Sequence, residues 1–363
     1  MSREQSKSPI RVLVVDDSAF MRTALSRMIA YDPQILAVGT AVSGTEALEK
    51  IPSLNPDVVT LDMEMPGIDG LETLRRIMAQ FPRPVIMVSS ITVKDAEATF
   101  RALEAGAFDY VPKQLSSTSL SVLHIREDLI EKIKSAAVSV HSTENTEWPR
   151  KPPRPVELPM KMGSHSIPAI IAVGISTGGP KALQQILPAL PADLPAPIVI
   201  VQHMPSGFTA PFANRLNTLC AATVREASNG ENADAGVVYI APAGCHMTVD
   251  RSPNSRPRIC LSGKPENQLH VPSADVMMQS VASAFGPLAM GIIMTGMGSD
   301  GAQGMSAIQR EGGFTVGQDE ATCAVYGMPR VCAEMGILDR VVPLSQIPYE
   351  IMQATGYRKS SVG

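Results

Sequence analysis

Cysteine, aromatic residues and net charge are all scarce in this chain of 363 residues. Its five cysteines form no CxxC pair, which argues against a zinc site or a disulfide framework and favours a reducing cytoplasm. A formal net charge of only -4 gives no reason to expect nucleic acid as a partner. The N-terminal segment has no signal-like apolar region, and no apolar run approaches ~18 residues, so we expect neither secretion nor membrane insertion.

The composition that remains is aliphatic, with 44% hydrophobic but only 4% aromatic residues, as is common in α/β proteins. A chain of this length has room for roughly two hydrophobic cores. Residues 138–166 are rich in proline and polar groups and have no periodic apolar face, which is typical of an interdomain linker. We therefore predict domains over residues 1–130 and 167–358, joined by a linker over residues 131–166.

In the first predicted domain, short apolar runs alternate with helical patterns. Ser18 is placed to cap the first helix, the spacing of Ser43 and Glu46 is that of a capping box, and Gly106 is a candidate C-terminal cap. Five such units predict an open parallel sheet with helices on both faces. The predicted strands cover residues 12–15, 36–39, 58–61, 85–88 and 108–111.

Polar side chains follow four of these predicted strands: Asp16 and Asp17, Asp62, Ser89, and Lys113. Each side chain taken alone is better explained as an ordinary solvated loop residue. Together they place several carboxylates at one edge of the sheet, where the acids repel one another unless a cation such as Mg²⁺ joins them. A magnesium-bound carboxylate beside a lysine can accept a phosphoryl group, so the cluster predicts a phosphorylation site.

The segments VLVVDDSAFMR, LDMEMPGIDGLE, VIMVSS and FDYVPK resemble those of a response-regulator receiver domain, over nearly all of residues 9–125. The resemblance implies a flavodoxin-like (βα)5 fold with Asp62 as the phosphoacceptor. The implied Mg²⁺ ligands are Asp16, Asp17, Asp62 and the main-chain carbonyl of Glu64.

The same resemblance implies that three residues respond to phosphorylation: Ser89 as the hydroxyl that turns toward the phosphoryl group, Lys113 as its cationic partner, and Tyr110 as the switch aromatic. One residue departs from the family pattern. Gln114 follows the lysine where the family usually has proline, so the cis peptide typical of that loop is left open.

The second predicted domain repeats the alternation of apolar runs and helical patterns. We expect a doubly wound, mostly parallel α/β domain with one β-hairpin, formed by residues 237–241 and 258–261. The other predicted strands cover residues 169–173, 197–202, 291–294 and 314–316, and the helices cover residues 180–187, 210–219, 276–285, 302–310 and 330–335.

The sequence IIAVGISTGG at residues 170–179 fits two kinds of turn. It is a glycine-rich strand-to-helix turn of the phosphate-binding kind, and it also matches the G-x-S-x-G elbow that exposes a nucleophilic serine, here Ser176. A dinucleotide site needs GxGxxG spacing and an acid at the end of the next strand, where this chain has Gln202 and His203. The nucleophile is therefore favoured.

A hydrolytic serine needs a base and a group that orients the base. His203 ends a predicted strand at the same sheet edge as Ser176, whereas a surface or packing role is expected for His246 and His270. Asp300 lies at another strand end between two glycines and is the candidate orienting acid, with capping of its own helix as the open alternative. The order serine, histidine, aspartate differs from that of the α/β-hydrolases.

The segments IAVGISTGGPKAL, VIVQHMP, YIAPAGCHM, PSADVMMQSVA, MTGMGSDGA and VYGMPR resemble the catalytic domain of the CheB-type chemotaxis methylesterases, over residues 167–355 approximately. The resemblance implies Ser176 as nucleophile, His203 as general base and acid, and Asp300 as the residue that orients His203. The implied oxyanion-hole donors are main-chain amides near Thr177 and Met297. Ile175 stands where the family more often has alanine, a change expected to narrow the pocket.

By this resemblance the protein hydrolyses glutamate γ-methyl esters, and deamidates certain glutamines, on the cytoplasmic domains of methyl-accepting chemoreceptors. Phosphorylation by the histidine kinase CheA is implied to relieve obstruction of the hydrolase by the receiver. Mg²⁺ is expected in the receiver only, and no cofactor for hydrolysis. A DNA-binding regulator is disfavoured, because residues 160–363 show neither a basic stripe nor a helix-turn-helix pattern. Action on a non-chemotaxis protein is left open.

Overall fold

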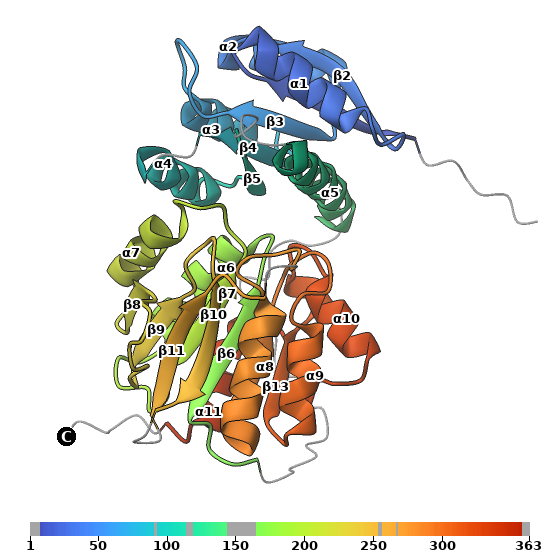
Figure 1. The fold of residues 1–363 in the computed structure, drawn as a ribbon. Coiled ribbons are helices and arrows are strands. Elements are labelled where there is room, and N and C mark those ends of the chain that lie inside the picture. Colours follow the sequence, from blue (N-terminus) through green and yellow to red (C-terminus); the bar gives the residue numbers. More distant parts are fainter. Residues whose placement is uncertain are drawn as a thin grey trace, which may run out of the picture. The chain divides into compact units, whose positions relative to one another are not determined.

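The computed structural model describes residues 8–90, 93–113, 119–143, 165–252, 256–265 and 268–357. The chain divides into two compact units, Met1–Trp148 and Pro149–Gly363, each an α/β unit around its own sheet (Figure 1). Among the helices of these described ranges, none is both long and apolar enough to cross a bilayer. The predicted two-domain α/β architecture is confirmed.

The first unit is built on a five-stranded sheet in the order β2-β1-β3-β4-β5, and every strand pairing in it is parallel. This is the flavodoxin-like order, as predicted. The elements are β1 (Ile10–Val15), α1 (Ala19–Ile29), β2 (Ile35–Ala41), α2 (Gly44–Leu54), β3 (Val58–Asp62), α3 (Gly70–Gln80), β4 (Val85–Ser89), α4 (Val93–Glu104), β5 (Asp109–Pro112) and α5 (Ser119–Thr143).

Local sequence signals set the helix ends of this unit. The Ser18 hydroxyl accepts a hydrogen bond from the Met21 amide at the start of α1, and Ser43 accepts one from the Glu46 amide at the start of α2. Gly106 follows α4 with φ 110°, the left-handed region that glycine tolerates. The local signals read from the sequence therefore mark these helix ends correctly.

The end of the first unit differs from the prediction. Residue 130 falls inside α5, which continues to Thr143; Leu129, Ile133 and Ala136 are fully buried at helical spacing against the core of the first unit. The division between the units comes after Trp148. Residues 144–164, which make up most of the predicted linker, lie outside the described residues.

The second unit is built on a seven-stranded sheet in the order β14-β13-β12-β6-β7-β9-β8, again with parallel pairings throughout. A separate two-stranded sheet is formed by β10 and β11. The elements are β6 (Ile170–Ile175), α6 (Gly179–Ile186), β7 (Ile198–Gln202), α7 (Thr209–Leu219), β8 (Thr223–Glu226), β9 (Val237–Ile240), β10 (His246–Arg251), β11 (Pro257–Ser262), α8 (Ala274–Phe285), β12 (Ala289–Ile293), α9 (Ala302–Arg310), β13 (Phe314–Gln318), α10 (Met328–Glu334), β14 (Arg340–Val342) and α11 (Ile347–Ala354).

The first strand of this unit, β6, lies at the point where the strand order reverses. Its neighbours are β7, which follows it along the chain, and β12, which comes much later. Loops leave such a point in opposite directions, which opens a crevice beyond the carboxyl ends of the strands. Helices α8 and α9 pack side by side, and α8 also packs against β6 and β12 (Figure 1).

The second unit does contain a hairpin, as predicted, but the predicted pairing of residues 237–241 with residues 258–261 is wrong. Residues 258–261 pair antiparallel with β10, whereas β9 lies in the main sheet, parallel to β7 and β8. The reason is that β9, with the sequence VVYI, is almost continuously buried, as expected for an internal parallel strand. In β10 the buried Met247 and Val249 alternate with less buried residues, which suits a hairpin with one covered face.

Candidate active site and candidate metal centre

Three predicted site residues of the second unit meet at the carboxyl ends of β6, β7 and β12. Ser176 Oγ lies 3.2 Å from His203 Nδ1, and His203 Nε2 lies 2.8 Å from Asp300 Oδ2. A proton on Nε2 is the tautomer that suits both contacts, because Nε2 then donates to the carboxylate and Nδ1 accepts from the serine hydroxyl. The His203 and Asp300 side chains are only 11% and 9% exposed, so little water competes for the pair.

Asp300 is held by the N-terminus of α8. Its Oδ1 accepts hydrogen bonds from Ser273 Oγ (2.7 Å) and the Asp275 amide (3.0 Å), and its Oδ2 accepts one from the Ala274 amide (2.7 Å). Burial opposes ionisation, but the bonds from His203 and these amides outweigh it and hold the pKa of the carboxyl well below its usual range. The carboxylate is therefore charged and fixed.

The alternative role of Asp300 as the cap of its own helix is not what the structure shows. Gly301, with φ 95°, occupies the N-cap position of α9. Asp275, in the first turn of α8, accepts a hydrogen bond from the Gly304 amide of α9 at 2.8 Å, and burial raises the pKa of Asp275. Asp300, in the loop before α9, thus accepts from the start of α8, and Asp275 of α8 accepts from the start of α9.

Two histidines have packing roles, as predicted, but sequence reasoning missed how close they lie to the site. The ring of His270 stacks on that of His203, with centroids 4.1 Å apart and planes inclined by 15°. His246 is fully buried; its Nδ1 accepts from the Ser273 amide (3.1 Å) and its Nε2 donates to the Pro265 carbonyl (3.1 Å). The contacts join residues far apart in the sequence, so no local pattern could have found them.

The turns beside Ser176 leave two amides free. Within the described part of the chain, the amides of Thr177 and Met297 donate no hydrogen bond, whereas the Ser176 amide donates to the Thr295 carbonyl (3.0 Å). Thr295 Oγ1 in turn donates to the Thr177 carbonyl (2.9 Å), in the peptide that follows the one carrying the Thr177 amide. Amides without an internal partner near a nucleophile are candidate donors to an oxyanion.

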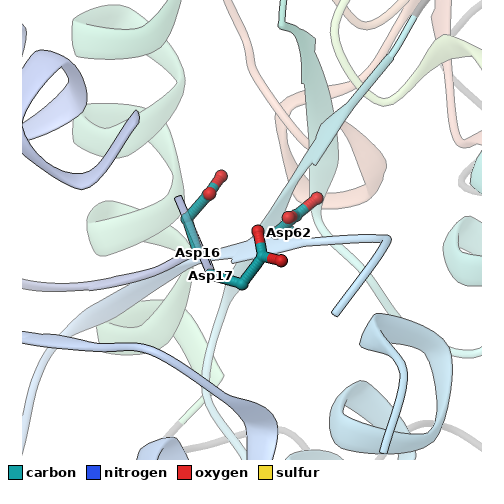
Figure 2. A group of neighbouring side chains, drawn as sticks. All are labelled: Asp16, Asp17 and Asp62. Carbon is teal, nitrogen blue, oxygen red and sulfur yellow. The ribbon is translucent and has the colours of Figure 1, made fainter. Parts of the chain in front are cut away.

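In the first unit, Asp16 and Asp17 follow β1 and Asp62 ends β3, and one carboxylate oxygen from each lies within 4.8 Å of the others. Figure 2 shows the three side chains gathered at these strand ends. Lys113 Nζ lies 2.6 Å from Asp62 Oδ1 and 3.1 Å from Asp16 Oδ2. Asp16 and Asp62 are buried while Asp17 is exposed, so the cluster has one open side.

The donor set fits a hard cation such as Mg²⁺. Asp62 Oδ2 is buried and has no hydrogen-bond partner in the described residues, and a buried carboxylate oxygen of this kind suits a metal bond. Burial raises the pKa of Asp62 to about 6, against the opposing effect of Lys113 and with the help of Asp16. The Glu64 amide donates to Asp62 Oδ1 at 3.1 Å, which places the Glu64 main chain beside the cluster.

The three predicted switch residues lie on or directly after neighbouring strands. Ser89, fully buried at the end of β4, accepts a hydrogen bond from Thr99 Oγ1 at 2.8 Å. Tyr110 is 3% exposed on β5, and Lys132 of α5 donates to its carbonyl (2.7 Å) and lies over its ring. Lys113 follows β5, while Gln114 lies outside the described residues.

Together, a flavodoxin-like unit with an acid–lysine cluster and a parallel α/β unit with an aligned serine, histidine and aspartate define a class: response regulators with a hydrolase as output domain. Known families agree with both halves. Residues 12–123 match the response regulator receiver domain, and residues 171–351 match the CheB methylesterase domain.

Two curated relatives match this chain over nearly its whole length, and a solved structure matches its second half. The protein-glutamate methylesterase/protein-glutamine glutaminase 2 of Nitratidesulfovibrio vulgaris is 46% identical, over 94% of this chain and 98% of its own. A protein-glutamate methylesterase/protein-glutamine glutaminase of Pyrococcus abyssi is 45% identical, over 95% and 93%. The crystal structure of the Thermotoga maritima CheB methylesterase catalytic domain is 38% identical with a TM-score of 0.50, and it covers 51% of this chain and 98% of its own.

The chain belongs to the CheB family of protein-glutamate methylesterases/protein-glutamine glutaminases. The family and the enzyme class predicted from the sequence motifs are confirmed.

Proposed function

We propose that this protein hydrolyses glutamate γ-methyl esters, and deamidates certain glutamines, on the cytoplasmic domains of methyl-accepting chemoreceptors, and so brings about sensory adaptation. The observation that carries the proposal is the alignment of Ser176, His203 and Asp300, with contacts of 3.2 and 2.8 Å, at the switch point of a parallel sheet. The relatives named for both activities support the choice of substrate.

In the first half of the reaction, Ser176 Oγ attacks the ester carbonyl carbon while its proton passes to His203 Nδ1. Asp300, already charged, stabilises the imidazolium through Nε2. The free amides of Thr177 and Met297 donate to the carbonyl oxygen as it becomes an oxyanion. One such donor contributes ~10²–10³ in rate.

In the second half, His203 returns the proton to the leaving oxygen, the bond from the carbonyl carbon to that oxygen breaks, and methanol departs. Water then attacks the acyl-enzyme and gives its proton to His203, which passes it to Ser176 Oγ. The products are a glutamate side chain and the regenerated enzyme. With a glutamine side chain the same steps release ammonia in place of methanol.

The first unit supplies control. Asp62 accepts a phosphoryl group from the histidine kinase CheA, with Asp16, Asp17, Asp62 and the Glu64 carbonyl holding Mg²⁺. When bound, the ion neutralises the crowded carboxylates and the incoming phosphoryl oxygens. Phosphorylation adds about -1.5 to -2 charges, to which Ser89, Lys113 and Tyr110 respond. The unphosphorylated receiver obstructs substrate access to the hydrolase, and its phosphorylation relieves the obstruction.

The experiment is methanol release from methylated receptor domains, with and without a phosphodonor, for the wild type and for Ser176→Ala. The variant should lose at least ~10⁴-fold in hydrolysis because the nucleophile is gone, and it should still form the acyl phosphate on Asp62. Methanol release that survives in Ser176→Ala would exclude the proposed mechanism. Release from a panel of other methylated proteins, but not from receptors, would exclude the proposed substrate.

A further inference from the structure

Gln202 is a buried polar residue at the end of an otherwise apolar strand. It closes β7, whose sequence is IVIVQ, and its side chain is 1% exposed. Its register partner on β6 is Ile175, the residue before the nucleophile. A glutamine is costly to bury, and a buried amide is normally kept for the hydrogen bonds that it makes.

Both hydrogen bonds of the Gln202 amide nitrogen go to the catalytic pair. Nε2 donates to the main-chain carbonyl of Ser176 at 3.0 Å and to that of His203 at 3.0 Å. A single NH₂ group therefore joins the nucleophile and the base, which come from different strands. The His203 amide also donates to the Ile175 carbonyl, at 3.2 Å, where β6 and β7 end.

The orientation of this amide is fixed by its surroundings. Rotation by 180° would point Oε1 at two carbonyl oxygens, which cannot donate. In the observed orientation Oε1 is buried and has no partner in the described residues. It also fills the space beside Gly179, where an added Cβ would lie 1.9 Å from Oε1. An apolar side chain would avoid the unpaired oxygen, so packing by itself does not explain a glutamine here.

We propose that Gln202 is a positioning residue that sets the distance between Ser176 Oγ and His203 Nδ1 by tying together the main chains of the two residues. It acts through the backbone and touches no reacting atom. This inference rests on the proposed Ser-His-Asp mechanism and deepens it. Proton transfer between Ser176 and His203 depends on a contact of 3.2 Å, and an error of about 1 Å in such a contact costs on the order of 100-fold.

The test compares Gln202→Met, which has similar length and no donor, with Gln202→Glu, which can donate to at most one of the two carbonyls and only when it is protonated. For both variants kcat on a methyl ester should fall by about 100-fold, while KM stays within about twofold, since substrate groups are untouched. Labelling of Ser176 by a serine-directed phosphonate should slow by a similar factor. A folded Gln202→Met protein with kcat within about twofold of the wild type would overturn the proposal.

The matched control is Thr315→Val, which removes a buried hydroxyl from β13 of the same sheet, where it donates to the Ile337 carbonyl at 2.8 Å. This variant should lose thermal stability and keep kcat, which separates damage to the core from damage to the site. If Gln202→Met does not fold, Gln202→Glu decides the question. Failure of both to fold would make Gln202 a residue of the core and overturn the proposal.

Ser176→Ala, run in parallel, separates this inference from the proposed function. Hydrolysis that persists in Ser176→Ala would contradict the mechanism itself. Hydrolysis lost in Ser176→Ala but normal in Gln202→Met would contradict only the role of Gln202.

Discussion

The two units place their polar clusters at the same position, the carboxyl ends of parallel strands, but they differ in how complete those clusters are. In the first unit Asp62 has a buried oxygen without a hydrogen-bond partner and a pKa raised to about 6. In the second, both oxygens of Asp300 are fully hydrogen-bonded and its pKa is lowered. In the function proposed above, the first cluster takes up a cation and a phosphoryl group, whereas the second already has its hydrogen-bond partners in place.

Burial raises the pKa of both Asp62 and Asp300, so burial does not explain why their pKa values shift in opposite directions. The opposite shifts come from the hydrogen-bond donors and charges around each carboxyl group. Asp62 shares the single ammonium of Lys113 with Asp16, whose own charge raises the pKa further. Asp300 receives four donors, from the ring of His203 and the start of α8. Donors at a helix N-terminus thus offset the cost of burying the Asp300 charge and hold the carboxylate in one orientation.

The largest expected effect tests the preorganised cluster. Asp300→Asn should lower kcat by ~10³–10⁴-fold, the loss typical when an amide replaces the acid of such a triad. In either orientation the amide nitrogen would face a donor, since Ala274 and His203 donate to one oxygen and Asp275 to the other. The fall in kcat is measured by steady-state hydrolysis of a methyl ester.

The control for that variant is Asp250→Asn, which changes a half-exposed acid on the hairpin of the same unit, paired with Arg258. Its kcat should match the wild type. Equal rates for the Asp300 variant and this control would show that Asp300 does not orient the base.

The next effect tests the incomplete cluster. Removal of Mg²⁺ by a chelator should slow phosphorylation of Asp62 by a small phosphodonor at least ~100-fold, because the ion supplies several kcal/mol of charge stabilisation. Quantification of the acyl phosphate measures it. Methanol release by residues 160–363 alone should be unchanged, and a parallel loss of both activities would contradict the separation of the two centres.

A smaller effect concerns the control of one unit by the other. Residues 160–363 alone should hydrolyse a methylated receptor about tenfold faster than the unphosphorylated full chain, which corresponds to ~1.4 kcal/mol between obstructed and accessible arrangements. A phosphodonor should raise the full chain toward the same rate. If the shortened protein is no faster, the receiver does not obstruct the hydrolase.

The smallest expected effect is on the pH dependence of the free energy of unfolding. Asp300 and Asp62 should change this free energy in opposite directions as the pH falls. The pKa of Asp300 is lowered by folding, so its stabilisation is present above about pH 4, the unfolded pKa, and is lost as the pH falls below that value. The pKa of Asp62 is raised to about 6, so its contribution becomes unfavourable as the pH rises from about 4 to 6.

Unfolding of the wild type, Asp300→Asn and Asp62→Asn in Mg²⁺-free buffer measures both contributions. The stability difference between the wild type and Asp300→Asn should shrink below about pH 4, and that between the wild type and Asp62→Asn should move in favour of the wild type as the pH falls from about 6 to 4. Each change should be on the order of 1 kcal/mol. If lowering the pH shifted both stability differences in the same direction, the contrast drawn between the Asp62 and Asp300 clusters would be contradicted.

The sequence by itself determined the features that local patterns encode. Alternating apolar runs and caps such as Ser18 and Ser43 predicted two parallel α/β units, and polar residues at strand ends predicted both clusters. Ser176, His203 and Asp300 were predicted to meet because parallel strands in a doubly wound sheet end at one edge, and in the structure they do.

Only the tertiary structure decided which partners these residues have. It pairs β9 with β7 and not with β11, continues α5 past residue 130, and directs Asp300 to the start of α8. It also stacks the ring of His270 on that of His203. Gln202 is hydrogen-bonded to the main-chain carbonyls of Ser176 and His203. Each contact joins segments that are distant in the chain, and periodicity and capping describe only neighbours along the chain.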